Sequence, residues 1–336
     1  MPKTLDATRK IRRGRLCIAH VRTSTVKVKQ NMISFIMPAK NASLYVGQAI
    51  DSLRQANYEN WELIVIDDHS ADDTLRLLKE VEKEDSRIRV YENDGYGKVL
   101  ALNYGYHLAN GDLIKCIDAD DVLAPTFFDF LQDMTDYDVS CHDCYIAERN
   151  LRVVSEYSMN RAFFSRSFDY CMKNLISLPR GVWLFKRPIG DMIFPMPDNL
   201  PFEDVWFSLI IKKYAGVNIR HIGKPLYYYR QHNDQVFGGV LNFESDIVLF
   251  RARRMLQLID VIKHEQTKRL VSGKDDENIF GHIRCFYELL AKETLSLGEI
   301  ITSCTPLEFK AKLLLYRKLS FLAPLIVRLK WSFDKR

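Results

Sequence analysis

The sequence predicts an α/β fold, in which a largely parallel sheet is flanked by helices and followed by a helical carboxyl-terminal extension. Between residues 32 and 118, apolar β-rich segments alternate with segments whose apolar residues recur every three or four positions, a pattern typical of parallel strands joined by helices. Acidic clusters follow the second and the fourth apolar segment. Because parallel strands end at one edge of their sheet, we expect both clusters to face a single ligand crevice.

The alternating elements can be assigned in order along the chain. The expected strands cover residues 32–38, 61–68, 87–93 and 112–118. The expected helices lie between them, at 45–56, from 70 onward with an apolar face of Leu75, Leu78 and Val81, and at 98–111. Ser70 is expected to cap the second helix, with two aspartates in its first turn. Gly111 is expected to end the third helix as a left-handed residue.

Beyond residue 135 the alternation fades. Strand patterns occupy 137–147, 151–158, 181–187 and 224–232, a helical pattern occupies 203–216, and residues 158–180 suit a variable loop or short helices. From about residue 243 the apolar spacing is strongly helical. We therefore divide the chain into a basic arm expected to be disordered (1–30), an α/β domain (31–235) and a helical region (236–336).

Composition limits the class of protein. The 336 residues are 47% hydrophobic and 27% charged, the balance of a globular protein. No apolar run is long enough to cross a bilayer and none follows the basic amino terminus, so we expect a cytoplasmic protein without a signal peptide. Seven scattered cysteines fit a reducing compartment. The pair Cys141 and Cys144 lacks the second pair that a structural zinc needs, which favours buried thiols in a strand.

Both ends of the chain are basic. Residues 1–30 hold nine Lys and Arg against one acid, and residues 306–336 hold eight against two. This distribution points to an anionic surface as partner and not to nucleic acid. Residues 310–333 interleave basic with apolar side chains, as an interfacial amphipathic helix pair broken at Pro324 would. A packed helix with a solvated basic face fits the same pattern.

The densest acidic cluster consists of Asp118, Asp120 and Asp121. Neighbouring carboxylates raise one another's pKa. A hard divalent cation, Mg²⁺ or Mn²⁺, bound together with substrate phosphates would offset their repulsion. The alternative for the cluster is a solvated acidic loop, and Asp121 is also a candidate cap for a helix that would follow it.

Four short motifs in order resemble those of family 2 glycosyltransferases, inverting enzymes of the GT-A fold. The motifs are Pro38 to Asn41, "VIDDHSADDT" at 65–74, "GYGKVLALNYGYHLANGDLIKCIDADD" at 95–121 and "FEDVW" at 202–206. The resemblance covers about residues 32–235. It implies a GT-A, Rossmann-like nucleotide-binding mixed sheet flanked by helices, a nucleoside diphosphate sugar as donor, and Mn²⁺ or Mg²⁺ as cofactor.

The resemblance also implies roles for particular residues. Those that would contact the donor's nucleotide, ribose or diphosphate are Pro38, Lys40, Asn41, Asp67, Asp68, Lys98, Asn103, Asp118 and Arg230. Asp120 and His232 would bind the metal ion. Residue 102 is Leu where the family often has Arg, so one polar contact of the family is unmatched.

The pair Glu203 and Asp204 matches the position where the family places its general base. Asp204 would take the proton from the acceptor hydroxyl during in-line attack, and Glu203 would bind the acceptor. Both acids also suit the positive first turn of a helix with no catalytic role.

We therefore expect an inverting, metal-dependent transferase that moves a sugar from UDP-hexose or UDP-N-acetylhexosamine to a cell-surface glycan (lipopolysaccharide, capsule or exopolysaccharide). The acceptor would be a saccharide or a lipid-linked saccharide, with peripheral contact at the anionic inner face of the cell membrane. One alternative is a sugar-1-phosphate nucleotidyltransferase, although the Gly-rich basic loop that such enzymes carry after the first strand is missing. The other is a catalytically inactive glycan- or membrane-binding protein of the same fold.

Overall fold

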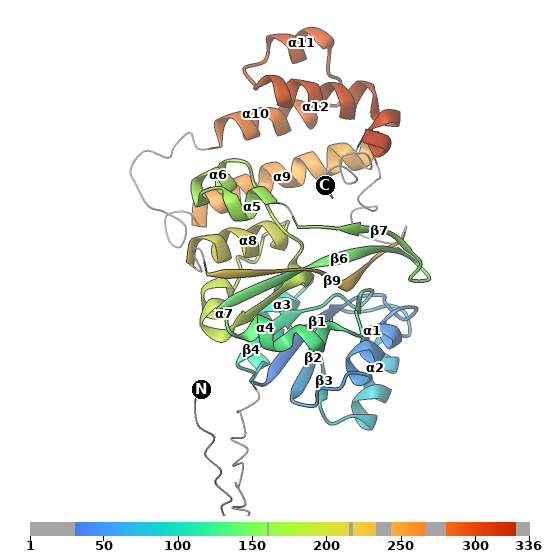
Figure 1. Ribbon diagram of the computed structural model, residues 1–336. Helices are drawn as coiled ribbons and strands as arrows, with labels where there is room; N and C mark the ends of the chain where they lie inside the picture. Colours follow the sequence, from blue (N-terminus) through green and yellow to red (C-terminus); the bar gives the residue numbers. More distant parts are fainter. Residues whose placement is uncertain (1–30, 160, 215–217, 233–242, 266–279, 327–336) are drawn as a thin grey trace, which may run out of the picture. The chain divides into compact units, whose positions relative to one another are not determined.

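A nine-stranded mixed sheet organises the part of the chain that this computed structural model describes, residues 31–159, 161–214, 218–232, 243–265 and 280–326. The strand order is β3-β2-β1-β4-β8-β6-β9-β5, with β7 paired to β6 (Figure 1). The expected basic arm, 1–30, lies outside the described residues.

The first half of the sheet is the parallel part that the sequence predicts. β1 (Ile33–Ala39) pairs with β2 (Trp61–Asp67) on one side and with β4 (Leu113–Cys116) on the other, and β2 pairs with β3 (Ile88–Glu92). β1 and β2 are buried along their whole length, as expected for strands covered on both faces. Because all four strands run the same way, the residues that follow them share one edge.

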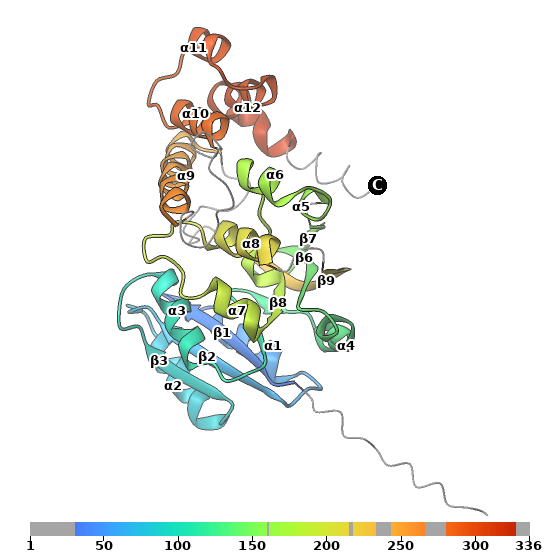
Figure 2. The same cartoon turned by 90° about the vertical axis from the view of Figure 1, so that its left-hand side faces the viewer.

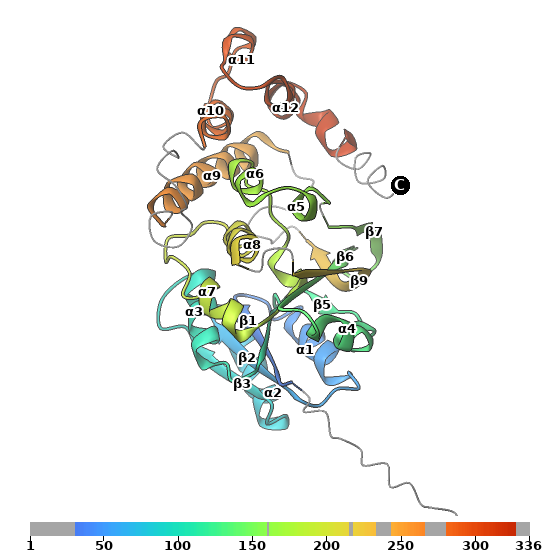
Figure 3. The ribbon, with the colours of Figure 1, turned by 60° about the vertical axis from the view of Figure 1, so that its left-hand side comes forward.

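Three helices connect these strands. α1 (Val46–Arg54) packs against α2 (Thr74–Glu84), and α3 (Lys98–Leu108) lies on the opposite side of the sheet from α1 (Figure 3). The expectation that Ser70 caps α2 is wrong. The helix begins later, at Thr74, whose N–H donates to the Asp72 carboxylate at 3.0 Å.

Gly111 does not end α3 as a left-handed residue, because α3 ends at Leu108 and the described glycine with positive φ is Gly97 (97°). The structure needs a glycine at 111 for a different reason. A Cβ there would lie 2.6 Å from the backbone nitrogen of Ser34, and the Gly111 N–H donates to the Ser34 hydroxyl at 2.7 Å. Glycine permits this close approach between β1 and the chain that enters β4.

The second half of the sheet brings distant segments to the same edge. β8 (Trp183–Lys186) joins β4 to β6 (Val139–Glu148), whose hairpin partner is β7 (Val153–Tyr157). β9 (Ile219–Gln231) pairs in parallel with β6 and antiparallel with β5 (Val122–Leu123). Pairing with β6 makes β9 longer at its start than the expected 224–232. Cys141 and Cys144 are buried in β6, as expected.

Short helices fill the connections of the α/β part. They are η1 (Phe127–Phe130), α4 (Leu131–Thr135), α5 (Arg161–Ser165), α6 (Phe168–Lys173), η2 (Arg180–Val182) and α7 (Arg187–Ile193). The longer α8 (Glu203–Tyr214) buries seven consecutive residues from Val205 to Ile211. Its acidic pair therefore stands in the first turn of a firmly anchored helix.

The carboxyl-terminal part is helical, as expected. It contains α9 (Ser245–Glu265), α10 (Gly281–Leu290), α11 (Leu297–Thr302), α12 (Leu307–Lys318) and η4 (Ser320–Leu322), with α10 in contact with both α9 and α12 (Figure 2). The expected break at Pro324 comes earlier, because α12 ends at Lys318. None of the described helices is long and apolar enough to span a membrane.

Candidate active site

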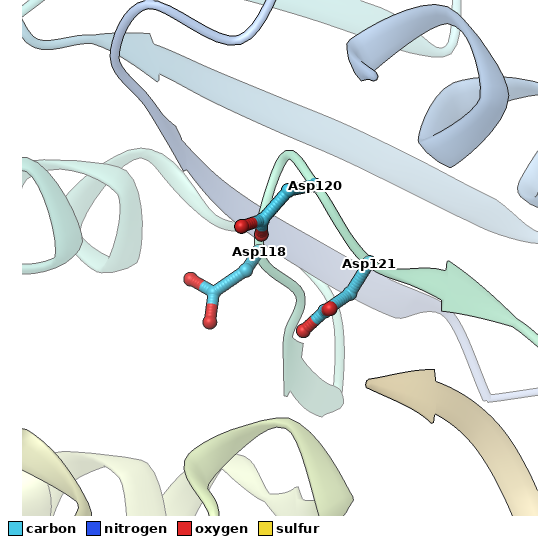
Figure 4. A group of neighbouring side chains, drawn as sticks. All are labelled: Asp118, Asp120 and Asp121. Atoms are coloured by element: carbon cyan, nitrogen blue, oxygen red, sulfur yellow. The ribbon is translucent and has the colours of Figure 1, made fainter. Parts of the chain in front are cut away.

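Three aspartates lie on the loop that leaves β4 at the carboxyl edge of the parallel strands. One carboxylate oxygen from each of Asp118, Asp120 and Asp121 lies within 4.8 Å of the other two. Figure 4 shows the three side chains on this loop, directly before β5. Because β4 and the β5–β9 pair hold both ends of the loop, the acidic cluster is an ordered feature of the fold.

Asp121 is buried and faces the protein. Its carboxylate accepts hydrogen bonds from the Tyr227 hydroxyl at 2.6 Å and from the Arg230 N–H at 2.8 Å. Burial, reinforced by the charges of Asp120 and Asp118, raises the pKa of Asp121 well above its ordinary value. The expectation that Asp121 caps a helix is wrong, because the chain first pairs with β9 as strand β5.

Asp118 faces two cations. Its Oδ1 lies 2.8 Å from the Lys98 ammonium and contacts the Arg180 guanidinium. Burial alone would raise the pKa of Asp118, but Arg180 and Lys98 outweigh it and hold the pKa below its ordinary value. Asp118 is therefore ionised, and its charge joins β4 to α3 and η2.

Asp120 pairs with the imidazole predicted to share its metal ion. Asp120 Oδ2 lies 3.0 Å from His232 Nε2, and the Tyr45 ring stacks on the imidazole with centroids 4.6 Å apart. The carboxylate is 25% exposed. The carboxylate oxygens of the cluster are the donors that Mn²⁺ and Mg²⁺ prefer, and the imidazole nitrogen is a ligand for transition metals more generally. These two residues would hold the ion, and a bound ion would neutralise a substrate diphosphate.

The side chain of Arg230 supports the acidic loop by donating hydrogen bonds to backbone carbonyls. The side chain is 1% exposed. Its Nε donates to the Asp120 carbonyl and its Nη1 to the Arg149 carbonyl, both at 2.6 Å, and its Nη2 donates to Gln48 Oε1 at 2.9 Å. These bonds fix the direction in which the loop presents Asp120. Binding of phosphate by Arg230 stays a prediction.

The second acidic cluster lies at the end of β2. The Asp68 carboxylate accepts hydrogen bonds from the Gly97 N–H at 2.7 Å, the Asn93 amide at 2.8 Å and the Lys40 ammonium at 3.0 Å. Although burial opposes it, these donors lower the pKa of Asp68. Asp67 accepts from the Ser70 N–H at 3.0 Å. This cluster is thus a network of fixed donors and acceptors at the shared edge.

Two more predicted residues border that network. Pro38 lies at the end of β1 opposite Ile66 of β2. Asn41, at φ 49°, accepts a hydrogen bond from the Ala71 N–H at 2.8 Å through its side chain. The loop after β1 is therefore held against the loop after β2.

Glu203 lies beside the two cations that hold Asp118, and Asp204 accepts a hydrogen bond from the backbone of one of them. Glu203 Oε1 lies 3.2 Å from the Lys98 ammonium and 3.7 Å from Arg180 Nε. The Arg180 N–H donates to Asp204 Oδ1 at 2.7 Å. Arg180 therefore connects the acidic loop after β4 with both acids of α8.

The two acids of α8 differ in their affinity for a proton. Burial, and next to it the charge of Glu203, raises the pKa of Asp204 to about 6. Burial alone would raise the pKa of Glu203 as well, but the charges of Lys98 and Arg180 outweigh burial and lower this pKa below its ordinary value. A carboxylate whose pKa lies near the working pH is suited to accept a proton from a substrate hydroxyl.

The structure does not bring Asn103 to the acidic clusters. Its amide donates to the Met196 carbonyl at 2.9 Å, and its carbonyl oxygen accepts from the Met196 N–H at 2.7 Å. The side chain thereby ties α3 to the loop before α8, and a contact with nucleotide stays a prediction.

Sequence reasoning missed Arg180. It lies 62 residues from Asp118, in a segment expected to be irregular, and it belongs to none of the four motifs. Its side chain is 1% exposed, and its Nη1 has no hydrogen-bond partner among the described residues. Only the fold, which sets η2 between β4 and α8, identifies it as a site residue.

Known proteins resemble this chain in sequence. Residues 34–193 match the family model described as "Glycosyl transferase family 2". Glycosyltransferase GlyG of Streptococcus pneumoniae is 27% identical over 267 residues, which are 73% of this chain and 82% of GlyG. WfgD of Escherichia coli, named as a UDP-Glc:alpha-D-GlcNAc-diphosphoundecaprenol beta-1,3-glucosyltransferase, is 38% identical over 92 residues, 27% of this chain and 36% of WfgD. The chain likewise spans only 31% and 38% of two glycosyltransferases from Haemophilus influenzae.

Solved structures show the fold. TarS of S. aureus, in complex with UDP-GlcNAc, has a TM-score of 0.51 at 16% identity and covers 85% of this chain and 87% of its own. The mannosyltransferase PcManGT of Pyrobaculum calidifontis, in complex with GDP-Man and Mn2+, has a TM-score of 0.52 at 17% identity, covering 92% and 89%.

The fold is therefore that of a GT-A glycosyltransferase, with a mixed sheet, flanking helices and a helical carboxyl-terminal region. Residues 34–193 make up a domain of glycosyl transferase family 2, and the relatives of the chain are bacterial glycosyltransferases.

Proposed function

We propose that this protein is an inverting, metal-dependent glycosyltransferase. It moves a sugar from a nucleoside diphosphate sugar, UDP-hexose or UDP-N-acetylhexosamine, to a saccharide acceptor of the cell surface. The observation that carries the proposal is the position of Asp204. The pKa of this carboxylate is about 6. Arg180 contacts both Asp204, through its backbone N–H, and the ionised Asp118 of the acidic loop, through its guanidinium.

The donor would occupy the edge formed by the two acidic clusters. Pro38, Lys40, Asn41, Asp67 and Asp68 would hold the base and ribose, with Asp118 toward the ribose. Asp120 and His232 would bind Mn²⁺ or Mg²⁺ beside the diphosphate. The Nη1 of Arg180 has no hydrogen-bond partner in the described part of the chain, which supports a contact with negative charge that develops on the leaving diphosphate.

The acceptor would approach from the side of α8. Asp204 would accept the proton of the attacking hydroxyl, while the C–O bond to the sugar forms and the bond to the diphosphate breaks. Glu203 would hold another hydroxyl of the acceptor. The diphosphoundecaprenol named in the acceptor of WfgD supports a lipid-linked saccharide.

A lipid-linked acceptor would require contact with the cytoplasmic face of a membrane, and we propose the carboxyl-terminal helices as the part that makes it. Leu307 is 82% exposed and Phe321 75% exposed, close in sequence to Lys310 and Lys318. Exposed apolar side chains together with basic ones are what contact with an anionic bilayer would use. We expect the protein to sediment with vesicles that contain phosphatidylglycerol and not with pure phosphatidylcholine; equal recovery from both would contradict membrane contact.

The experiment that tests the proposed function is a donor screen with UDP-, GDP- and dTDP-sugars in the presence of Mn²⁺. Release of the nucleoside diphosphate, faster with a saccharide acceptor than with water alone, is the expected result. Pyrophosphate released from a nucleoside triphosphate and a sugar-1-phosphate would support a nucleotidyltransferase instead. Binding of UDP and Mn²⁺ without turnover of any donor would support an inactive binding protein.

A further inference from the structure

A lysine lies in the core of the sheet directly beneath the candidate site. Lys115 belongs to β4, three residues before Asp118, and its side chain has no exposed surface. Burial lowers the pKa of the Lys115 ammonium to about 7. Burying an ammonium costs free energy that an apolar residue in the same strand would not cost. The contacts of the ammonium show which part of the structure a lysine at this position stabilises.

The ammonium of Lys115 meets three uncharged acceptors. Its Nζ lies 2.5 Å from the Gly181 carbonyl oxygen, 3.0 Å from His142 Nε2 and 3.5 Å from the Trp183 carbonyl oxygen. The Nδ1 of His142 lies 2.8 Å from the Asp143 carbonyl oxygen. An imidazole that donates from Nδ1 can accept at Nε2, so below the lysine's pKa of about 7 the three N–H groups of the Lys115 ammonium each find an acceptor.

The shortest of these bonds goes to the η2 turn, which carries Arg180. Gly181 follows Arg180 in the chain and is itself constrained, because a Cβ on Gly181 would lie 2.7 Å from the Tyr227 ring. The Lys115 ammonium thus bonds to this turn, and the Tyr227 ring leaves it no room for a side chain at 181. The turn in turn places the Arg180 N–H on Asp204 and the Arg180 guanidinium on Asp118.

We propose that Lys115 is a positioning residue for glycosyl transfer, acting through the Gly181 carbonyl to set Arg180 between the donor-side Asp118 and the base Asp204. This inference rests on the proposed function, because it assigns Lys115 to the same reaction. It does not require Lys115 to touch donor, acceptor or metal ion. A small shift of the turn would separate Arg180 from both carboxylates at once. The Arg180 backbone N–H bonds to Asp204 and the guanidinium of the same residue contacts Asp118.

A double-mutant cycle tests the inference. Lys115→Met keeps the length of the side chain and removes the ammonium, and Arg180→Ala removes the group on which Lys115 would act. We expect Lys115→Met to lower kcat at least about tenfold in the wild-type background, and less than about twofold in the Arg180→Ala background. Losses that multiply in the double variant would overturn the inference.

The pH profile separates positioning from general damage. The charged and titratable groups that act on Asp204 are Glu203, Arg180, Lys98 and Tyr229. Because Arg180 lowers the pKa of Asp204, a displaced turn should move the acidic limb of kcat/KM to higher pH in Lys115→Met. Ile114→Val, a buried change in the same strand, should leave the limb in place. A limb that does not move in Lys115→Met would also overturn the inference.

Two further measurements keep the outcomes distinct. If Lys115→Met does not fold, as judged by its thermal unfolding, His142→Leu removes one acceptor of the ammonium and should give a smaller loss of kcat that also vanishes in the Arg180→Ala background. A loss that persists there counts against the inference. Absence of transfer in the wild-type protein would instead refute the proposed function.

Discussion

Glu203→Gln should move the acidic limb of the pH profile of kcat/KM to lower pH. The pKa of Asp204 is raised from 3.8 to about 6, a difference of about two units, or about 3 kcal/mol in favour of the protonated form. Burial is the larger cause, and the charge of Glu203 comes next. The Gln variant keeps the size of the side chain and removes the charge, so burial alone remains to oppose ionisation.

The direction in which activity changes with pH follows from the role of Asp204 as the base. Asp204 accepts a proton only when it is ionised, so activity is half-maximal at a pH of about 6, approaches its plateau about one unit higher and is lost as the pH falls below 6. If removal of Glu203 lowers the pKa by about one unit, the ionised fraction at pH 5 rises from about 0.1 to about 0.5. Relative to its own plateau, the variant should then be about fivefold more active at pH 5 than the wild type.

The assay is the initial rate of nucleoside diphosphate release at low donor concentration between pH 4.5 and 8, in buffers of constant ionic strength. A lower plateau from weaker acceptor binding does not affect the position of the limb. Glu156→Gln, a change of an exposed acid on β7, should leave the limb unchanged. A limb that stays in place or moves to higher pH in Glu203→Gln would refute the assignment of Asp204 as the base.

Three further predictions concern other parts of the molecule. Asp204→Asn should reduce transfer by about 10²-fold or more and leave binding of UDP and Mn²⁺, measured by calorimetry, intact; wild-type rates would contradict this. Asp120→Ala should abolish the rise in melting temperature that UDP gives with Mn²⁺, and an unchanged rise would remove Asp120 from the metal site. Gly111→Ala should destabilise the protein by about 1–3 kcal/mol in urea unfolding, because its Cβ would meet the Ser34 nitrogen at 2.6 Å; unchanged stability would show that the strands separate easily.

The parallel half of the sheet could be predicted from the sequence because its strands and helices differ in apolar period. β1, β2, β3 and β4 and their helices alternate along the chain, so local patterns were sufficient. The two acidic clusters could be placed at one edge for the same reason. The Gly111 expectation failed because a close approach to Ser34, 77 residues away, leaves no local signal.

Contacts between distant segments explain the other differences between the site expected from the sequence and the site in the structure. Asp121 looked like a helix cap because the residues after it are apolar, but pairing with β9, more than a hundred residues later, makes them a strand. Arg180 has no motif, and its importance comes from η2 lying between β4 and α8. Lys115 sits within an apolar strand, where the sequence shows a polar residue but not the carbonyl that it holds.

The configuration of the first sugar product tests the central claim most directly. The enzyme is mixed with an α-linked UDP-sugar, Mn²⁺ and water or a saccharide acceptor, and the anomeric proton is followed by NMR before mutarotation. Direct displacement assisted by Asp204 predicts that the β anomer forms first, and that Asp204→Asn forms none. An α product formed first would contradict an inverting transfer with Asp204 as its base.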